Sequence, residues 1–158
     1  RWLYDKKEVV EPVQELDIRD IKPKVIQSGQ DFTFVAAGFS VQNALEVSRI
    51  LSEHGYSGEI IDLRVLNPLD FTVILESTTK TGRLFVLDGG WSPASLSSEV
   101  IASVTEKLPP STFKISPKRF TLPFAPAPSG KSLEDAYYPK PGQIATEILT
   151  IIKSEVAN

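Results

Sequence analysis

The chain has 158 residues, enough for one domain with a buried core, and its 41% hydrophobic and 23% charged content is ordinary for a globular protein. A net charge of −3 and a pI near 5.2 argue against nucleic acid or an anionic membrane as the main partner. The absence of cysteine excludes disulfides, thiolate nucleophiles and cysteine-based metal sites, and a single histidine leaves little room for a zinc site.

The first 24 residues predict a linker or arm from a preceding domain. Residues 1–5 carry Trp2 and Tyr4 with no periodic pattern after them, and residues 6–24 mix charges with two prolines. We expect the two aromatic side chains to pack on a neighbour or on this domain's own surface. Because the chain lacks methionine and opens on Arg1, we also expect it to be a segment of a longer protein.

From residue 25 to residue 158, apolar patterns typical of strands and helices alternate along the chain. An edge strand is predicted near Val25, and a proline-rich passage at 117–128 precedes the last helix. Such alternation predicts an α/β domain in which helices cover both faces of a mostly parallel sheet. The further predicted strands cover 32–36, 60–63, 84–87 and 113–115, and the predicted helices begin near 40, 70, 95 and 141.

Charged side chains follow two of the predicted strands. Asp62 and Arg64 interrupt the stretch from Glu59 to Asp70, and Asp88 follows the strand 84–87. The carboxyl edge of an open α/β sheet is where ligands or interfaces lie. These charges therefore predict either a small-ion site or a hydrogen-bonded network that fixes loops and a subunit contact. Trp91, after two glycines, is predicted to anchor an interface.

No stretch assembles a catalytic or cofactor-binding set. Gly38-Phe39-Ser40-Val41-Gln42 resembles a hydrolase nucleophile elbow without its final glycine, and His54 lies about 21 Å along the same predicted helix. Ser40 is instead predicted to be a helix N-cap. The segment 129–132 resembles the end of a P-loop, but Ala125 replaces its first glycine. The residues alone thus predict no catalytic, cofactor-binding or metal-binding side chains.

The order and spacing of several short motifs carry a family resemblance from Asp31 to Ile148. The motifs are Asp31–Val35 with Gly38, Ile61–Asp70, Lys80–Arg83, Asp88 with Trp91, Glu99, Pro126 and Pro128, Leu133-Glu134, and Tyr138-Pro139. The sequence resembles the C-terminal domain of transketolase-like, thiamine-diphosphate-dependent enzymes. It is most similar to the β-subunit of 2-oxoacid dehydrogenase E1 components.

This resemblance implies a three-layer αβα domain with a five-stranded, mixed sheet that is mostly parallel. It implies that thiamine diphosphate and Mg²⁺ bind in other domains of the parent enzyme, and that this domain serves subunit assembly without chemistry. Expected partners are other subunits, including a homodimer contact, and the E2 acyltransferase, in the cytoplasm or the mitochondrial matrix. Ser40, Asp62, Arg64, Asp88, Trp91, Glu99 and Glu134 are the candidate rim or interface residues. An alternative is a free-standing regulatory domain that binds a small anion or metabolite through Ser40, Asp62, Arg64 and Asp88.

Overall fold

Five short strands form one mixed sheet in the computed structural model, which describes residue 15 and residues 17–156. The strand order is β1-β3-β2-β4-β5, with β1 antiparallel to β3 and the other neighbours parallel. The predicted fold class is therefore confirmed. The strands are β1 (Lys24–Gln27), β2 (Phe32–Ala36), β3 (Gly58–Asp62), β4 (Leu84–Trp91) and β5 (Lys118–Leu122). The helices are η1 (Ile18–Asp20), α2 (Phe39–Ser52), α3 (Thr72–Thr81), α4 (Leu96–Lys107), η2 (Pro110–Thr112), α5 (Lys131–Tyr137) and α6 (Pro141–Val156).

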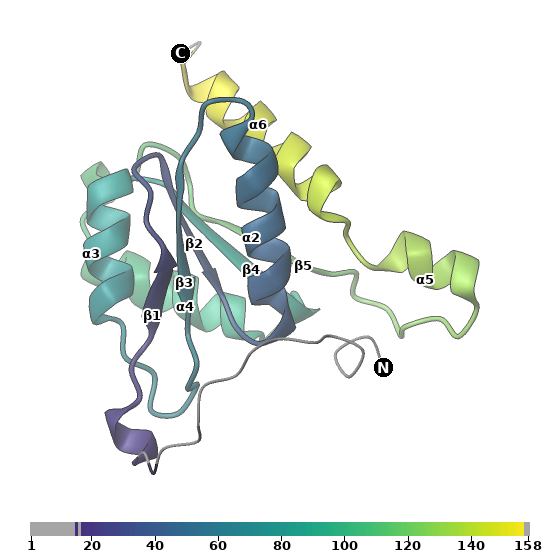
Figure 1. Ribbon diagram of the computed structural model, residues 1–158, viewed down its shortest axis with the longest axis horizontal. Coiled ribbons are helices and arrows are strands. Elements are labelled where there is room, and N and C mark those ends of the chain that lie inside the picture. Colours follow the sequence, from purple (N-terminus) through teal and green to yellow (C-terminus); the bar gives the residue numbers. More distant parts are fainter. Residues whose placement is uncertain (1–14, 16, 157–158) are drawn as a thin grey trace.

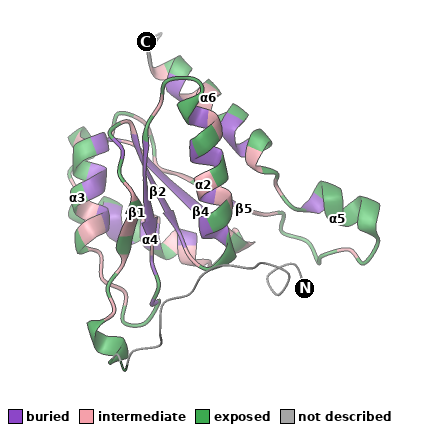
Figure 2. Ribbon diagram, in the orientation of Figure 1, coloured by how far each residue is buried: buried purple, intermediate pink, exposed green. Residues whose placement is uncertain are grey.

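Helices cover both faces of the sheet, as Figure 1 shows. One face packs on α2 and α6, where Phe34 and Phe85 meet Val47 and Ile148 in one core cluster. The other face packs on α3 and α4 in a second cluster, which includes Val35. Neighbouring residues of β2 thus serve opposite faces, as the alternation of side chains along a strand requires. Burial in Figure 2 is accordingly concentrated in the sheet and on the inner sides of these helices.

The central strand β2 is buried along its whole length. This is typical of parallel strands covered on both faces, and it explains the uninterrupted apolar run in the sequence. Phe32, Phe34 and Phe85 lie with ring centroids 5.9–6.5 Å apart at steep angles. Edge-to-face packing of this kind stabilises a core beyond the area it buries. These rings fix the position of the strands whose ends form the candidate site.

The fifth strand is a correction to the sequence analysis. The strand predicted at 113–115 is wrong, because β5 lies a few residues later, inside the passage assigned as proline-rich loop. Phe113 and Ile115 do pack on the core, but from a loop. β5 is an edge strand, and edge strands carry charges that discourage pairing with other chains. Lys118 and Arg119 interrupt the apolar pattern from which a strand would be predicted, so β5 was missed. The short helix α5 was missed as well.

The starts of α2, α3 and α4 differ from the predicted ones by one or two residues, and the start of α2 corrects a predicted role. Ser40 is not the N-cap of α2, because the helix already begins at Phe39, after Gly38 with φ 55°. That positive φ, which glycine adopts without strain, turns the chain directly from β2 into the helix. Gly82 ends α3 in the left-handed conformation, which glycine adopts readily at the end of a helix. Trp2 and Tyr4 of the predicted arm lie outside the described residues.

Candidate functional site at the carboxyl edge of the sheet

The ends of β3, β2 and β4 bring the predicted charges to one edge of the sheet. Ala36 at the end of β2 is in register with Asp62 of β3 on one side and with Leu87 of β4 on the other. Asp62 and Asp88 are therefore separated by the width of β2, about 10 Å between their backbones. The two residues therefore lie on the same edge but on strands that are not neighbours.

A cavity of about 830 Å³ opens beside this edge, between the sheet, the start of α2 and α5. Three of the predicted residues line it: Ser40, Asp88 and Glu134. Asp62, Arg64, Trp91 and Glu99 are not among its lining residues. The apolar part of its wall comes from Phe39, Leu66, Leu87, Leu96, Phe120, Leu122, Tyr138 and Pro139.

Asp88 connects β4 to the start of α4. Its Oδ1 accepts a hydrogen bond from the Gly90 backbone N–H at 2.9 Å, and its Oδ2 accepts one from the Ser97 N–H at 2.9 Å. The Ser97 N–H lies in the first turn of α4, where N–H groups have no partner within the helix. Ser95 caps the same turn by accepting from the Ser98 N–H. Both Asp88 oxygens are thus engaged in holding a loop and a helix start.

Asp62 and Arg64 also act locally. Asp62 Oδ1 accepts from the backbone N–H of Arg64 at 3.1 Å, and Arg64 has φ 59°, in the left-handed region that non-glycine residues rarely adopt. The carboxylate therefore stabilises an unusual turn after β3. Among the described residues, no hydrogen bond or ion pair joins Arg64 to Asp88.

Ser40 is buried, and its hydroxyl oxygen lies 3.7 Å from where a Cβ on Gly89 would stand. The base that a hydrolase would require is remote, because His54 lies beyond the opposite end of α2. A general base must be within hydrogen-bonding reach of the proton that it removes, directly or through one water. His54 is therefore too far away to act as the general base for Ser40.

Trp91 joins the end of β4 to the segment that follows β5. Its Nε1 donates a hydrogen bond to Tyr137 Oη at 2.9 Å, and its ring meets Phe124 edge-on at 5.6 Å. Tyr137 Oη in turn donates a hydrogen bond to the Ala125 carbonyl oxygen at 2.7 Å. Trp91 stays 45% exposed in the single chain. Sequence reasoning missed Tyr137, since only tertiary contacts distinguish it from Tyr138.

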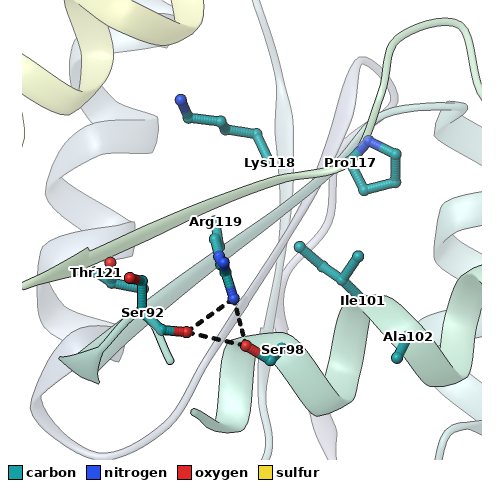
Figure 3. Close-up of a pocket in the computed structure, with 8 residues that line it drawn as sticks. All are labelled: Ser92, Ser98, Ile101, Ala102, Pro117, Lys118, Arg119 and Thr121. Atoms are coloured by element: carbon teal, nitrogen blue, oxygen red, sulfur yellow. Dashed lines mark hydrogen bonds between the residues drawn. The ribbon is translucent and has the colours of Figure 1, made fainter. Parts of the chain in front are cut away.

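Glu99 lies on the outer surface of α4, where its Oε1 accepts from the Ser103 hydroxyl at 2.9 Å on the same helix. A second, open hollow of about 570 Å³ lies near this helix, next to β5 (Figure 3). There Arg119 donates to the Ser92 carbonyl at 2.8 Å and to the Ser98 hydroxyl. Its guanidinium thus holds the loop before α4 against the edge strand.

Hydrogen bonds lower the pKa values of several carboxyl groups, and two of them, Asp70 and Glu59, belong to the stretch around β3 and α3. The Thr72 hydroxyl and N–H, with the Lys22 ammonium 3.1 Å away, lower the pKa of Asp70 to about 2 at the start of α3. Burial raises the pKa of Glu59, but hydrogen bonds from Lys80 and Ser77 outweigh it, and the net shift is downward. Both carboxylates are therefore stabilised in their charged form by structural contacts.

The donor set of the described residues does not fit Mg²⁺ with a diphosphate. No group of three or more histidine, aspartate or glutamate side chains converges there on a point that could hold a metal ion. Asp62 and Asp88 at this edge already accept backbone N–H groups, and the cavity beside them has more carboxylates than cations, which disfavours a diphosphate. We therefore derive no chemical step through thiamine diphosphate in this chain.

A family model described as "Transketolase, C-terminal domain" matches residues 22–144. The chain belongs to this family. A β-subunit of acetoin:2,6-dichlorophenolindophenol oxidoreductase from Bacillus subtilis is 35% identical over 140 residues, covering 87% of this chain and 40% of that protein. A pyruvate dehydrogenase E1 component β-subunit from Leifsonia xyli is 36% identical over 138 residues, covering 85% of this chain and 38% of that protein. The chain is thus a transketolase C-terminal domain of E1 β-like type and spans about two-fifths of these relatives.

Solved structures agree on the fold of this transketolase C-terminal domain. A split-gene transketolase described as an inactive β4 tetramer has a TM-score of 0.67 at 22% identity and covers 89% of this chain and 46% of its own. A transketolase mutant from Pichia stipitis has a TM-score of 0.54 at 15% identity, and the match covers 86% of this chain and 18% of that chain. Within residue 15 and residues 17–156, no helix is long and apolar enough to cross a bilayer.

Proposed function

We propose that this domain holds the subunits of an E1 β-like or transketolase-like enzyme together, and that the chemistry of that enzyme takes place in other domains. The observation that carries the proposal is the apolar surface around the carboxyl-edge cavity. Three large apolar side chains that line this cavity are 44–52% exposed: Phe39, Leu66 and Tyr138. Contiguous exposed apolar surface on a globular domain marks an interaction site.

The polar groups at the same edge support assembly over catalysis. Asp62 accepts the Arg64 N–H through one oxygen and Asp88 accepts two N–H groups through both of its oxygens, so both side chains stabilise the turns of this edge. The relatives named above are subunits, and one structural neighbour is described as a tetramer of β chains. We therefore propose a second copy of this chain as the main partner.

Sedimentation equilibrium of the 158-residue chain, from about 1 µM to about 100 µM, tests this proposal. We expect the mass to rise toward that of a dimer, and Leu66→Ser to weaken association about tenfold by removing an exposed apolar contact. Ile26→Ser is the matched control, because Ile26 is exposed on the edge strand β1, away from the cavity. A mass of one chain at every concentration would overturn the proposed homodimer contact.

The cofactor prediction has its own test. We propose that thiamine diphosphate and Mg²⁺ belong to the parent enzyme, so calorimetric titration of this chain with both should give no binding heat. Binding of thiamine diphosphate and Mg²⁺ by this chain alone would contradict the proposal that they bind in other domains. The E2 acyltransferase as a partner, and the cytoplasm or mitochondrial matrix as location, stay predictions.

The charges that line the cavity bear on the alternative in which this domain binds a small anion or metabolite. Its charged lining residues are Asp88, Glu134 and Asp135 against Lys140, and Arg64 does not line it. An excess of carboxylates disfavours the small anion that this alternative supposed. A thermal-shift screen of anions should therefore leave the midpoint unchanged, and a shift that is lost in Arg64→Ala would restore the alternative.

A further inference from the structure

The carboxyl-edge cavity contains polar side chains that the domain itself does not use. Ser40 lines it and is only 7% exposed, yet no hydrogen bond joins its hydroxyl to another described residue. Asn43 follows on α2, lines the same cavity half-buried, and its side-chain amide likewise has no partner within residues 17–156. Residues three apart on a helix share one face. Buried polar groups are normally hydrogen-bonded, so these two require partners that water or a ligand in the cavity supplies.

The cavity has the size and the wall of a small-molecule site. Its volume of about 830 Å³ lies within the roughly 300–1,000 Å³ of ligand pockets in proteins. Apolar side chains form much of its wall, and Phe39, Phe120 and Tyr138 contribute aromatic rings. Small-molecule sites combine such a wall with a few polar groups that orient the ligand. Ser40 and Asn43 are polar groups of this kind.

The charge of the lining favours a cation as the bound group. Lys140 is the one basic side chain among the lining residues, and its Nζ lies 3.3 Å from Asp135 Oδ1 in an ion pair. Asp88 binds backbone N–H groups with both of its oxygens. In contrast, no hydrogen bond or ion pair to a described residue engages the side chain of Glu134. The Glu134 carboxylate is therefore the charge still open to a ligand, and an ammonium group complements it.

The start of α2 beside the cavity does not favour an anion instead. The N–H groups of Ser40 and Val41 donate to the carbonyl oxygens of Ala37 and Gly38, each at 3.2 Å. Anions bind helix starts through N–H groups that have no other partner, and these two are engaged. The aromatic rings of the wall also favour a cation, because the face of such a ring attracts positive charge.

We propose that the carboxyl-edge cavity binds a small amphipathic amine. The ammonium group of the ligand pairs with Glu134, and its apolar body packs on the aromatic wall. A hydroxyl or carbonyl group on the same ligand bonds Ser40 and Asn43. This inference goes beyond the proposed assembly function, which concerns the exposed apolar surface around the cavity.

Three probes with one hydroxyphenyl skeleton test the charge of the ligand. Tyramine ends in an ammonium group, tyrosol in a hydroxyl and para-hydroxyphenylacetate in a carboxylate. Ligand-observed NMR with the 158-residue chain gives the dissociation constant of each probe. We expect tyramine to bind at least about tenfold more tightly than tyrosol, and the carboxylate to bind most weakly. Tyramine binding no tighter than tyrosol overturns the proposal, and so does tightest binding by the carboxylate.

Two variants assign the preference to the cavity. Glu134→Gln removes the charge but keeps the length of the side chain and good helix propensity, so it should lower tyramine affinity to that of tyrosol and leave tyrosol binding unchanged. Ser40→Ala should weaken both probes about threefold to tenfold by removing one hydrogen-bonding group. Glu106→Gln is the matched control, because Glu106 is exposed on α4 and does not line the cavity. Circular dichroism verifies that each variant keeps the wild-type helix content.

A full tyramine preference in Glu134→Gln, or an equal loss in Glu106→Gln, overturns the proposed site. Sedimentation equilibrium of the same samples without a probe tests the assembly function separately. A chain that prefers tyramine but keeps the mass of one copy supports the amine site and overturns only the homodimer contact. A chain that dimerises without preferring tyramine supports assembly and overturns only the amine site.

Discussion

Replacement of Asp88 by alanine tests whether the most suggestive charge at the carboxyl edge is a ligand group or a structural one. The variant leaves the N–H groups of Gly90 and Ser97 without their 2.9 Å acceptors. Loss of an N-terminal capping side chain costs about 0.5–2 kcal/mol, and a hydrogen bond to a charged group contributes about 1.5–3 kcal/mol.

Two circumstances set the expected magnitude. Asp88 is half-buried, so water can partly replace it, and Ser95 continues to cap the same turn of α4. We therefore expect Asp88→Ala to lower the free energy of unfolding by about 2 kcal/mol, and the melting temperature by about 4–8 °C for a chain of this size. Asp88→Asn retains one acceptor oxygen and should lose about half as much.

Urea unfolding followed by circular dichroism measures the effect, at one fixed protein concentration because association would itself stabilise the fold. Glu99→Ala is the control: this carboxylate is exposed on α4 and accepts only the Ser103 hydroxyl, so its removal should cost less than about 0.5 kcal/mol. A group kept for ligand binding is often costly to stability, and its removal is then neutral or stabilising. An Asp88→Ala variant as stable as the wild type would therefore refute the structural role.

Two further predictions concern packing and pH. Gly58→Ala should destabilise the domain by about 1–3 kcal/mol in the same urea assay, because the new Cβ would stand 2.3 Å from the buried Phe32 ring, whereas Gly142→Ala meets nothing within 4 Å and should not destabilise. For Asp70, the folded pKa of about 2 lies below the ordinary 3.8, so its stabilising contribution is complete above pH 3.8 and is lost as the pH falls toward 2. Unfolding free energies measured from pH 5 to pH 2 should therefore fall less steeply in Asp70→Asn than in the wild type, and equal slopes would contradict the assignment.

The sheet could be predicted where local pattern and burial agree. β2 is buried along its length, so its apolar run identified it without tertiary information. β5 failed because an edge strand needs only one buried side chain in five, Phe120, and takes charges on its open side. Its identity as a strand depends on pairing with β4, which no local window contains.

Among the helix ends, too, some follow from local sequence and others depend on the backbone geometry. Gly82 was predictable, because a glycine after an amphipathic run is the usual end of a helix. Ser40 was misassigned because serine is a common N-cap, whereas here the positive φ of Gly38 moved the helix start forward. Residue type alone favours Ser40, whereas the backbone turn at Gly38 decides where the helix begins.

The candidate site demonstrates why residue type alone does not identify a function. Asp62 and Asp88 were predicted at the sheet edge, and register places them there. What no pattern reveals is the direction of each carboxylate, and both accept backbone N–H groups two residues further along the chain. Such short-range bonds are the ordinary role of aspartate in turns after a strand. Asp62 and Asp88 thus shape the turns at this edge, and the exposed apolar side chains of Leu66 and Tyr138 beside them are what favours an interface over an ion site.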